Sequence, residues 1–291
     1  MFKRMQGIIG IWMVFGLISA CSWTSVSAQP SAGHWTAQAD VLFRAQPIGL
    51  AWLPRVGYRV PLSDSKALLY DGTHVEVGGV SALSPASLHA GGYFKVVPLA
   101  PLVLKLEAQQ LRFLGLFGNL RTFDRPADWS VLDESLDVTS GEHATGYKVR
   151  AESIFRVVLG PILGIVSYSG NWQGMDMPAD QNWYDPTLDM IFEPNDFMHE
   201  LHANLAGILW GHPKASEVLA LGIRWHSMVT EKSGYKRQML GGLALWKPGI
   251  LVEQDFTILA TVCGYLEDPY RTGPYVGGAL RMTWEKLGVA D

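Results

Sequence analysis

Charged and apolar side chains alternate along many segments of this 291-residue chain, and residues 146–157 show the pattern clearly. Lys148, Arg150 and Glu152 share one parity, whereas apolar residues such as Val149 have the opposite parity. Successive side chains of a strand point to opposite faces, so this segment predicts a strand with one charged and one apolar face. Basic side chains gathered around an aqueous path would favour the passage of anions.

The same parity, extended along the chain, places a larger set of charged side chains on one face of the predicted strands. Basic residues outnumber acidic ones in this set. We expect the following residues to line a lumen: Arg55, Arg59, Lys105, Glu107, Lys148, Arg150, Glu152, Arg156, Glu200, Arg224 and Arg281. They predict a narrow channel for small anionic solutes. The alternative is a structural or surface-interaction barrel without transport, whose lumen is plugged by its own ion pairs, as small barrels have interiors filled by side chains.

Two further patterns resemble catalytic motifs, and neither predicts an enzyme. His199 and His202 flank Glu200, but they lie three positions apart in a predicted strand, whereas zinc proteases need two histidines four apart on a helix. His226 and Ser227 are adjacent, so they face opposite sides of a strand and cannot act together as base and nucleophile. We therefore assign no catalytic residue, no metal ligand and no cofactor.

Residues 171–197 form an acidic segment between two predicted strands, with six Asp or Glu residues and no Lys or Arg. Oxygen ligands at this density could hold Ca²⁺ or Mg²⁺, although their spacing differs from that of an EF-hand; solvated carboxylates are the alternative. Aromatic residues among the acids, such as Trp183 and Phe192, predict that this segment folds onto another surface, for example the mouth of a barrel.

Twelve strands of consistent parity must position these residues, although a count of 10 or 14 is also compatible with the pattern. Most are near the length of a tilted strand that crosses a bilayer, and short connections alternate with long ones. We expect the longest outer loops at 114–144 and 171–197. The predicted strands cover residues 35–45, 51–61, 66–76, 86–97, 102–113, 145–157, 161–170, 198–210, 216–229, 236–246, 252–265 and 273–285.

The first residues of the chain predict a secretory signal. A basic pair precedes an apolar run that is too short to span a bilayer as a helix. Cleavage after Ala28 would remove residues 1–28 and leave residues 29–291 as a single barrel domain. A lipobox ending at Cys21, which would make this residue a lipidated N-terminus, is the alternative.

Composition narrows the class of protein. The formal net charge of −4 argues against nucleic acid as a partner. The chain is 48% hydrophobic and contains 11 Trp, yet no apolar run beyond the N-terminal segment is long enough for a transmembrane helix.

Residues 35–285 resemble bacterial outer-membrane β-barrel proteins as an architectural class. The resemblance implies an all-β, antiparallel transmembrane barrel in the outer membrane of a Gram-negative cell. It also implies membrane lipid and lipopolysaccharide as partners. The alternative is a secreted or lipid-anchored soluble β-rich protein, in which the apolar faces of the strands would form one interior.

Overall fold

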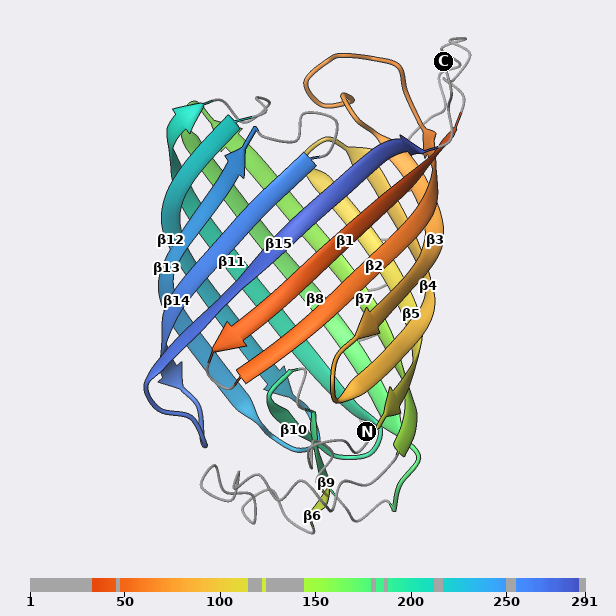
Figure 1. The fold of residues 1–291 in the computed structure, drawn as a ribbon, viewed down its shortest axis with the longest axis vertical. Helices are drawn as coiled ribbons and strands as arrows, with labels where there is room; N and C mark the ends of the chain where they lie inside the picture. Colours follow the sequence, from red (N-terminus) through yellow and green to blue (C-terminus); the bar gives the residue numbers. More distant parts are fainter. Residues whose placement is uncertain are drawn as a thin grey trace, which may run out of the picture. The chain divides into compact units, whose positions relative to one another are not determined.

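The computed structural model describes residues 33–45, 48–114, 122–123, 144–178, 182–185, 188–211, 217–249 and 255–287. Fifteen strands lie within these ranges (Figure 1). Twelve of them are long: β1 (His34–Ala45), β2 (Ile48–Pro61), β3 (His74–Leu83), β4 (Ser87–Leu99), β5 (Leu102–Phe113), β7 (Ala144–Leu159), β8 (Ile162–Met175), β11 (Asp196–Gly211), β12 (Glu217–Thr230), β13 (Lys236–Pro248), β14 (Asp255–Glu267) and β15 (Pro274–Leu287). The other three, β6 (Thr122–Phe123), β9 (Asn182–Asp185) and β10 (Met190–Phe192), form a small separate sheet.

The twelve long strands close into one antiparallel barrel, because β1 pairs with both β2 and β15. Each of the other strands pairs with its two neighbours along the chain, once the small sheet is set aside. The predicted fold class, an all-β barrel of about twelve antiparallel strands, is confirmed. Within the described ranges, the structure contains no helix long and apolar enough to cross a membrane.

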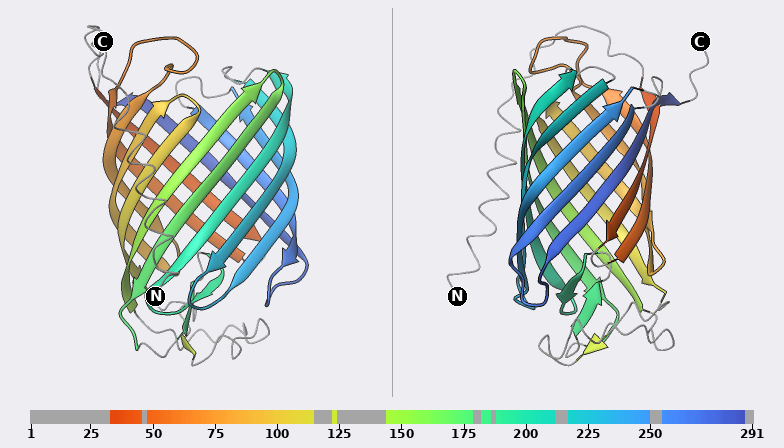
Figure 2. Two further views of the ribbon diagram at one scale, coloured as in Figure 1. Left: turned by 180° about the vertical axis from the view of Figure 1, so that it is seen from behind. Right: turned by 60° about the vertical axis from the view of Figure 1, so that its left-hand side comes forward.

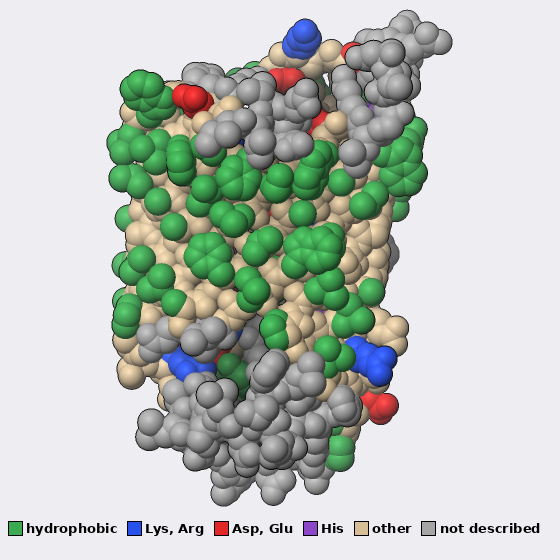
Figure 3. Space-filling view, viewed as in Figure 1, with side chains coloured by type: hydrophobic (Ala, Val, Ile, Leu, Met, Phe, Trp, Pro, Cys, Tyr) green, Lys and Arg blue, Asp and Glu red, His purple; other side chains and the backbone are tan. Residues whose placement is uncertain are grey.

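The outer face of the barrel is apolar. Leu106, Leu221 and Ile223, for example, are about half exposed although each lies in the middle part of a strand. Figure 3 shows apolar side chains over the visible wall, with charged side chains mainly toward the two ends. An apolar surface of this extent is far larger than soluble proteins expose, so it faces lipid. The soluble alternative required these side chains to form one interior, and their exposure contradicts it.

The two ends of the barrel differ in their connections (Figure 2). One end carries the start of β1, the end of β15 and tight turns such as that between β7 and β8; we call it the turn end. The other, the loop end, carries the connections from β5 to β7 and from β8 to β11, which contain the small sheet. The two expected long loops therefore lie at the same end of the barrel.

The third predicted strand, at residues 66–76, is wrong. The third barrel strand is β3, and residues 62–73 form a long connection at the turn end in place of the expected short turn. The connection closes where the backbone N–H of Leu62 donates to the carbonyl oxygen of Thr73. Gly72 precedes this point with φ of +77°, a conformation that favours glycine and ends the turn. Residues 1–28, with the predicted signal and both processing sites, lie outside the described residues.

Candidate functional site in the barrel interior

Most of the predicted lumen residues contact one another or other charged side chains of the barrel strands. They come from β2, β5, β7, β11, β12 and β15, and the strand register brings several of them together. Lys105 lies opposite Glu152, and Glu107 lies opposite Arg150, across the ladder between β5 and β7. Opposite charges on neighbouring strands can therefore pair across the inner wall.

Near the turn end, Glu76 on β3 is the centre of a polar cluster that sequence analysis missed. Its Oε2 atom lies 2.9 Å from Arg59 Nε and 3.3 Å from Lys95 Nζ. The hydroxyl of Tyr93 donates a hydrogen bond to Oε1 over 2.6 Å. Arg59 also contacts Glu285 on β15, with 2.6 Å between Nη1 and Oε1. The predicted strand at residues 66–76 ends at Glu76, so the sequence did not indicate that this residue lies within a strand beside Arg59 and Lys95.

Further ion pairs lie on the inner wall at Glu107 on β5 and at the seam between β15 and β1. Glu107 contacts Lys105 and lies 3.4 Å from Arg55. Arg281 on β15 pairs with Asp40 on β1 over 2.7 Å, across the seam that closes the barrel. The side chain of Arg281 is 55% exposed. Arg156, another predicted lumen residue, is also exposed.

Glu200 organises the middle of the lumen. Its Oε2 atom accepts a hydrogen bond from Ser169 Oγ at 3.1 Å and lies 3.2 Å from Arg150 Nη2. Arg150 also contacts Glu152 at 3.0 Å. Lys148 lies on the same face of β7, opposite Gln173 on β8. Glu200 is buried, so its charge is balanced by direct partners rather than by bulk water.

Two histidines meet the other oxygen of Glu200. The Nε2 atoms of His202 and His226 lie 2.8 Å and 3.1 Å from Glu200 Oε1, and the two rings stack with centroids 3.9 Å apart. Arg224 Nη2 lies 3.0 Å from His202 Nδ1. From the sequence, His226 was considered only as a possible base for its neighbour Ser227. The signal that finds this cluster is strand register, which sets His226 directly opposite His202.

His199 faces away from this cluster, as its parity predicted. It is 40% exposed on the outer wall, where its Nδ1 atom lies 2.7 Å from the hydroxyl of Tyr168. Its Nε2 atom lies 3.0 Å from Glu231 Oε1. The two histidines that flank Glu200 in the sequence therefore stand on opposite sides of the barrel wall.

Near the loop end, an apolar cluster packs against the inner wall. We call its loop contribution, residues 182–185 and 188–192, the plug. Trp183 and Phe192 of the plug stack with centroids 5.2 Å apart, and both are fully buried. Around them lie buried residues of β5, β8, β10, β11 and β12 and of the loop before β13: Leu111, Phe113, Met175, Met190, Ile191, Met198, Met228 and Tyr235. The prediction that aromatic residues of this acidic segment fold back onto the barrel is confirmed.

A buried ion-pair network fastens the plug to β13 and to the loop between β14 and β15. Asp189 of the plug lies 3.1 Å from Arg237 Nη2 and 2.7 Å from Arg271 Nη2. Arg237 also pairs with Asp268 over 2.6 Å. Burial and the neighbouring Asp189 carboxylate raise the pKa of Tyr184 well above its usual value. Tyr184 therefore stays protonated and donates a hydrogen bond to Asp189 over 2.5 Å.

The acidic residues of this segment that the structure describes do not all behave as solvated carboxylates. Asp196 accepts hydrogen bonds from the backbone N–H groups of Lys232 and Ser233, at 2.8 Å and 3.1 Å. The carboxylate of Asp189 is occupied by two arginines and a tyrosine. Since protein donors already use these oxygens, the hypothesis of a Ca²⁺ or Mg²⁺ site finds no support at Asp189 or Asp196.

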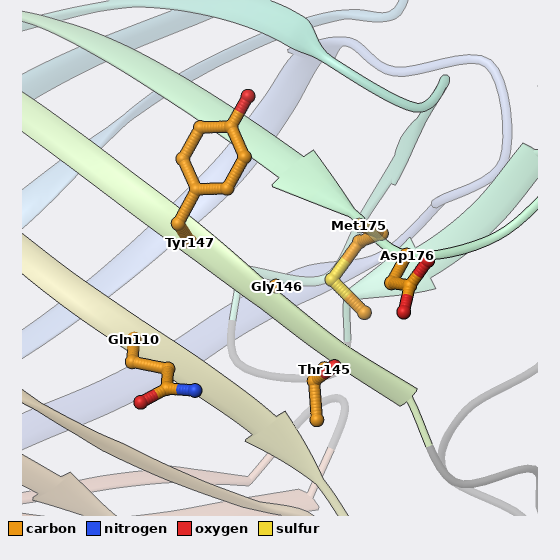
Figure 4. A pocket seen from close by; sticks show the side chains of 6 residues that line it. All are labelled: Gln110, Thr145, Gly146, Tyr147, Met175 and Asp176. Carbon is orange, nitrogen blue, oxygen red and sulfur yellow. The ribbon is translucent and has the colours of Figure 1, made fainter.

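A shallow depression also lies at the loop end between β5, β7 and β8 (Figure 4). Its lining residues are Gln110, Thr145, Gly146, Tyr147, Met175 and Asp176. This lining includes a single carboxylate and no basic side chain, so it offers no pair of groups for acid–base chemistry. The interior remains the better candidate for a functional site.

Comparison with known proteins gives distant likenesses in structure and no match in sequence. No family model matches the chain, and no curated protein matches it in sequence. Among solved structures, the β domain of the Bordetella autotransporter BrkA is similar at 10% identity and a TM-score of 0.45, covering 87% of this chain and 98% of that one. OmpT, an outer membrane protein of Vibrio cholerae, is similar at 8% identity and a TM-score of 0.35, covering 89% and 100%.

The toluene transporter TodX of P. putida is similar at 9% identity and a TM-score of 0.33, covering 88% of this chain and 90% of that one. At such low identity these likenesses concern the fold alone. Together with the apolar outer face, the closed barrel defines the chain as an outer-membrane β-barrel protein.

Proposed function

We propose that the protein is a gated channel of the bacterial outer membrane, which passes small anionic solutes when the plug leaves the mouth of the barrel. The observation that carries the proposal is the buried apolar plug at the loop end of the barrel. Trp183, Ile191 and Phe192 are at most 1% exposed, so they occupy space that a solute crossing this half of the lumen would need.

The charges of the lumen support an anionic solute. Arg59 and Lys95 lie toward the turn end of their strands, Arg55 and Arg281 lie near the middle of theirs, and each retains exposed surface. Basic groups that keep contact with water can attract anions and pass them along the wall. The same groups pair with acidic partners, so a solute would have to compete for them.

This pairing favours a second candidate function, a structural barrel without transport. Glu76, Glu107 and Glu200 each contact more than one basic side chain. A lumen filled by such pairs resembles the packed interiors of small barrels. The two functions predict different ion conductance when the plug is removed.

Planar-bilayer conductance tests the proposal. The variant replaces Met190, Ile191 and Phe192 by serine, which removes the apolar contacts that hold the plug in the mouth. A matched control replaces three exposed residues of the turn end, Leu68, Leu69 and Tyr70, by serine. A heat-dependent shift in gel migration verifies that each barrel is folded.

We expect silent bilayers for the wild type and the control, and stepwise anion-selective currents for the plug variant. Silence of a folded plug variant would overturn the channel and favour the structural barrel. Steady currents through the wild type would show that the plug does not close the lumen. Cation-selective steps would contradict the proposed solute class.

A further inference from the structure

Three side chains with metal-binding groups converge in the middle of the lumen: Glu200, His202 and His226. One ligand atom from each lies within 4.8 Å of the other two. Glu200 and His202 are two positions apart on β11 and so share its inner face, while His226 lies directly opposite His202 on β12. A continuous ladder of backbone hydrogen bonds therefore holds all three positions.

The two carboxylate oxygens of Glu200 have different surroundings. Oε2 is held by Ser169 and Arg150, at 3.1 Å and 3.2 Å. Oε1 faces the two imidazoles, with 2.8 Å to His202 Nε2 and 3.1 Å to His226 Nε2. Contacts such as those from Ser169 and Arg150 to Oε2 fix the orientation of a metal-binding carboxylate and leave its second oxygen free to bind.

We propose that Glu200, His202 and His226 form a binding site for a divalent transition metal ion, and that Zn²⁺ fits this donor set best. Two imidazoles and a carboxylate are the three protein ligands of known zinc sites that keep a fourth position open. Zinc lies about 2.0–2.2 Å from such donors, which places neighbouring donors of a tetrahedral site roughly 3.3–3.6 Å apart. The observed separations from Glu200 Oε1 need only small adjustments to reach this range.

Metal binding requires one imidazole to turn. The two rings stack with 11° between their planes, and their Nε2 atoms lie 2.8 Å and 3.1 Å from the same carboxylate oxygen, so the three donors must separate before an ion fits between them. His226 is the ring that can turn, because among the described residues its buried Nδ1 atom has no hydrogen-bond partner that rotation would break. The fourth ligand position would face the lumen and accept water or an anion.

Arg224 provides a further test, because the direction in which its removal changes metal affinity can be predicted. An imidazole that binds a metal through Nε2 carries its proton on Nδ1, so Nδ1 of His202 would become a donor. Arg224 now donates to that atom over 3.0 Å, and the two donors would repel each other. Removing the guanidinium should therefore strengthen metal binding, whereas a simple hydrogen-bond cluster would show no such gain.

Zn²⁺ titration of the untagged full chain, folded in detergent and stripped with a chelator, tests the site by competition with a chromogenic chelator. We expect about one Zn²⁺ per wild-type chain. His202→Ala, His226→Ala and Glu200→Gln should lose this binding. Ser169→Ala, which removes a contact that orients Glu200, should weaken it about tenfold. Arg224→Ala should tighten it.

His199→Ala is the matched control, since His199 lies on the same strand but faces outward. It should bind Zn²⁺ like the wild type. The visible absorption of Co²⁺ bound to the wild type reports imidazole coordination even if a ligand variant fails to fold. Absence of stoichiometric Zn²⁺ binding in the wild type overturns the proposal. Equal loss of binding in His199→Ala and His202→Ala, or weaker binding in Arg224→Ala, overturns it as well.

Discussion

Two ion pairs in different parts of the lumen have the same length and very different surroundings. Arg271 and Asp189, near the loop end, are separated by 2.7 Å and their side chains are 5% and 1% exposed. Arg281 and Asp40, on the seam between β15 and β1, are also separated by 2.7 Å, but the arginine is 55% exposed. Distance alone therefore says little about what an ion pair contributes, because water screens the second pair and is excluded from the first.

The difference extends to the two halves of the lumen. The loop half combines a fully buried apolar cluster with arginines that are 3–5% exposed. In the turn half, Arg59 and Lys95 remain 16% and 22% exposed beside the buried Glu76. One half is packed like a protein core, whereas the other keeps its charges in reach of water. This asymmetry is what a barrel closed at one end requires.

The largest effect is expected for Asp189→Ala. The change leaves Arg237 and Arg271 without the carboxylate that they share, and breaking a buried pair in this way costs about 3–5 kcal/mol. Because Asp189 belongs to the plug, we expect the loss to release the plug rather than to unfold the barrel. Protease cleavage within residues 182–192 should accelerate, while the heat-dependent gel shift is retained.

Asp176→Ala is the control for this prediction, since Asp176 is an exposed acid of the same segment. Its cleavage rate should equal that of the wild type. If the plug of Asp189→Ala resists protease as well as the wild type does, the apolar cluster alone holds it in place. The difference in burial between the two ion pairs would then have no functional consequence.

A somewhat smaller effect is expected on the outer wall, for Leu221→Arg. Both halves of the lumen place their charges inside a wall that lipid surrounds. Leu221 is 49% exposed on the outer face of β12, and an arginine near the bilayer midplane costs about 2–4 kcal/mol. Urea titration of the protein folded into lipid vesicles, followed by tryptophan fluorescence, measures the loss.

Leu221→Met, which keeps the surface apolar, should leave the urea midpoint almost unchanged. If the arginine variant were as stable as the wild type, the outer face of β12 would not lie in lipid. The assignment of inner and outer faces would then have to be reversed.

The sequence predicts the barrel because alternation is a local property. Residues 102–108 and 146–152 alternate clearly, and both lie in strands with the expected faces. Between residues 66 and 80 the pattern is ambiguous, because glycines such as Gly78 add no side chain to either face. The third strand was therefore drawn too early, and Glu76 was not recognised as a partner of Arg59.

The clusters inside the barrel are harder to predict because they depend on register and on long-range folding. Parity placed Glu200 inside, but only the pairing of β11 with β12 brings His226 opposite His202. The pairing of Asp189 with Arg237 joins residues 48 positions apart through a loop that folds back into the mouth. Nothing in the local pattern around either residue identifies the other.

Glu76→Gln should have an intermediate effect, which sharpens the comparison within the turn half. The change removes the negative charge between Arg59 and Lys95, and hydrogen bonds to charged groups contribute about 1.5–3 kcal/mol. The expected loss lies at the low end of this range, because Arg59 keeps Glu285 and both basic side chains reach water. The urea titration should show this loss of stability, while the protease resistance of the plug stays unchanged.

Tyr93→Phe is the companion variant, since it removes one neutral donor to Glu76 and leaves both ion pairs in place. It should cost less than Glu76→Gln. If the two variants destabilise the barrel equally, packing around Tyr93 rather than the charge of Glu76 stabilises this part of the wall.

The smallest effect is expected for Arg281→Gln, and it completes the comparison with the buried pair of the same length. Because Arg281 is 55% exposed, its pairing with Asp40 should contribute only about 0–1 kcal/mol, and high salt should reduce the difference from the wild type further. Urea titrations at low and high salt measure both quantities. A loss as large as that expected for Asp189→Ala would mean that the turn half excludes water as well as the loop half does. The lumen would then be sealed at both ends, which favours the structural barrel over the gated channel.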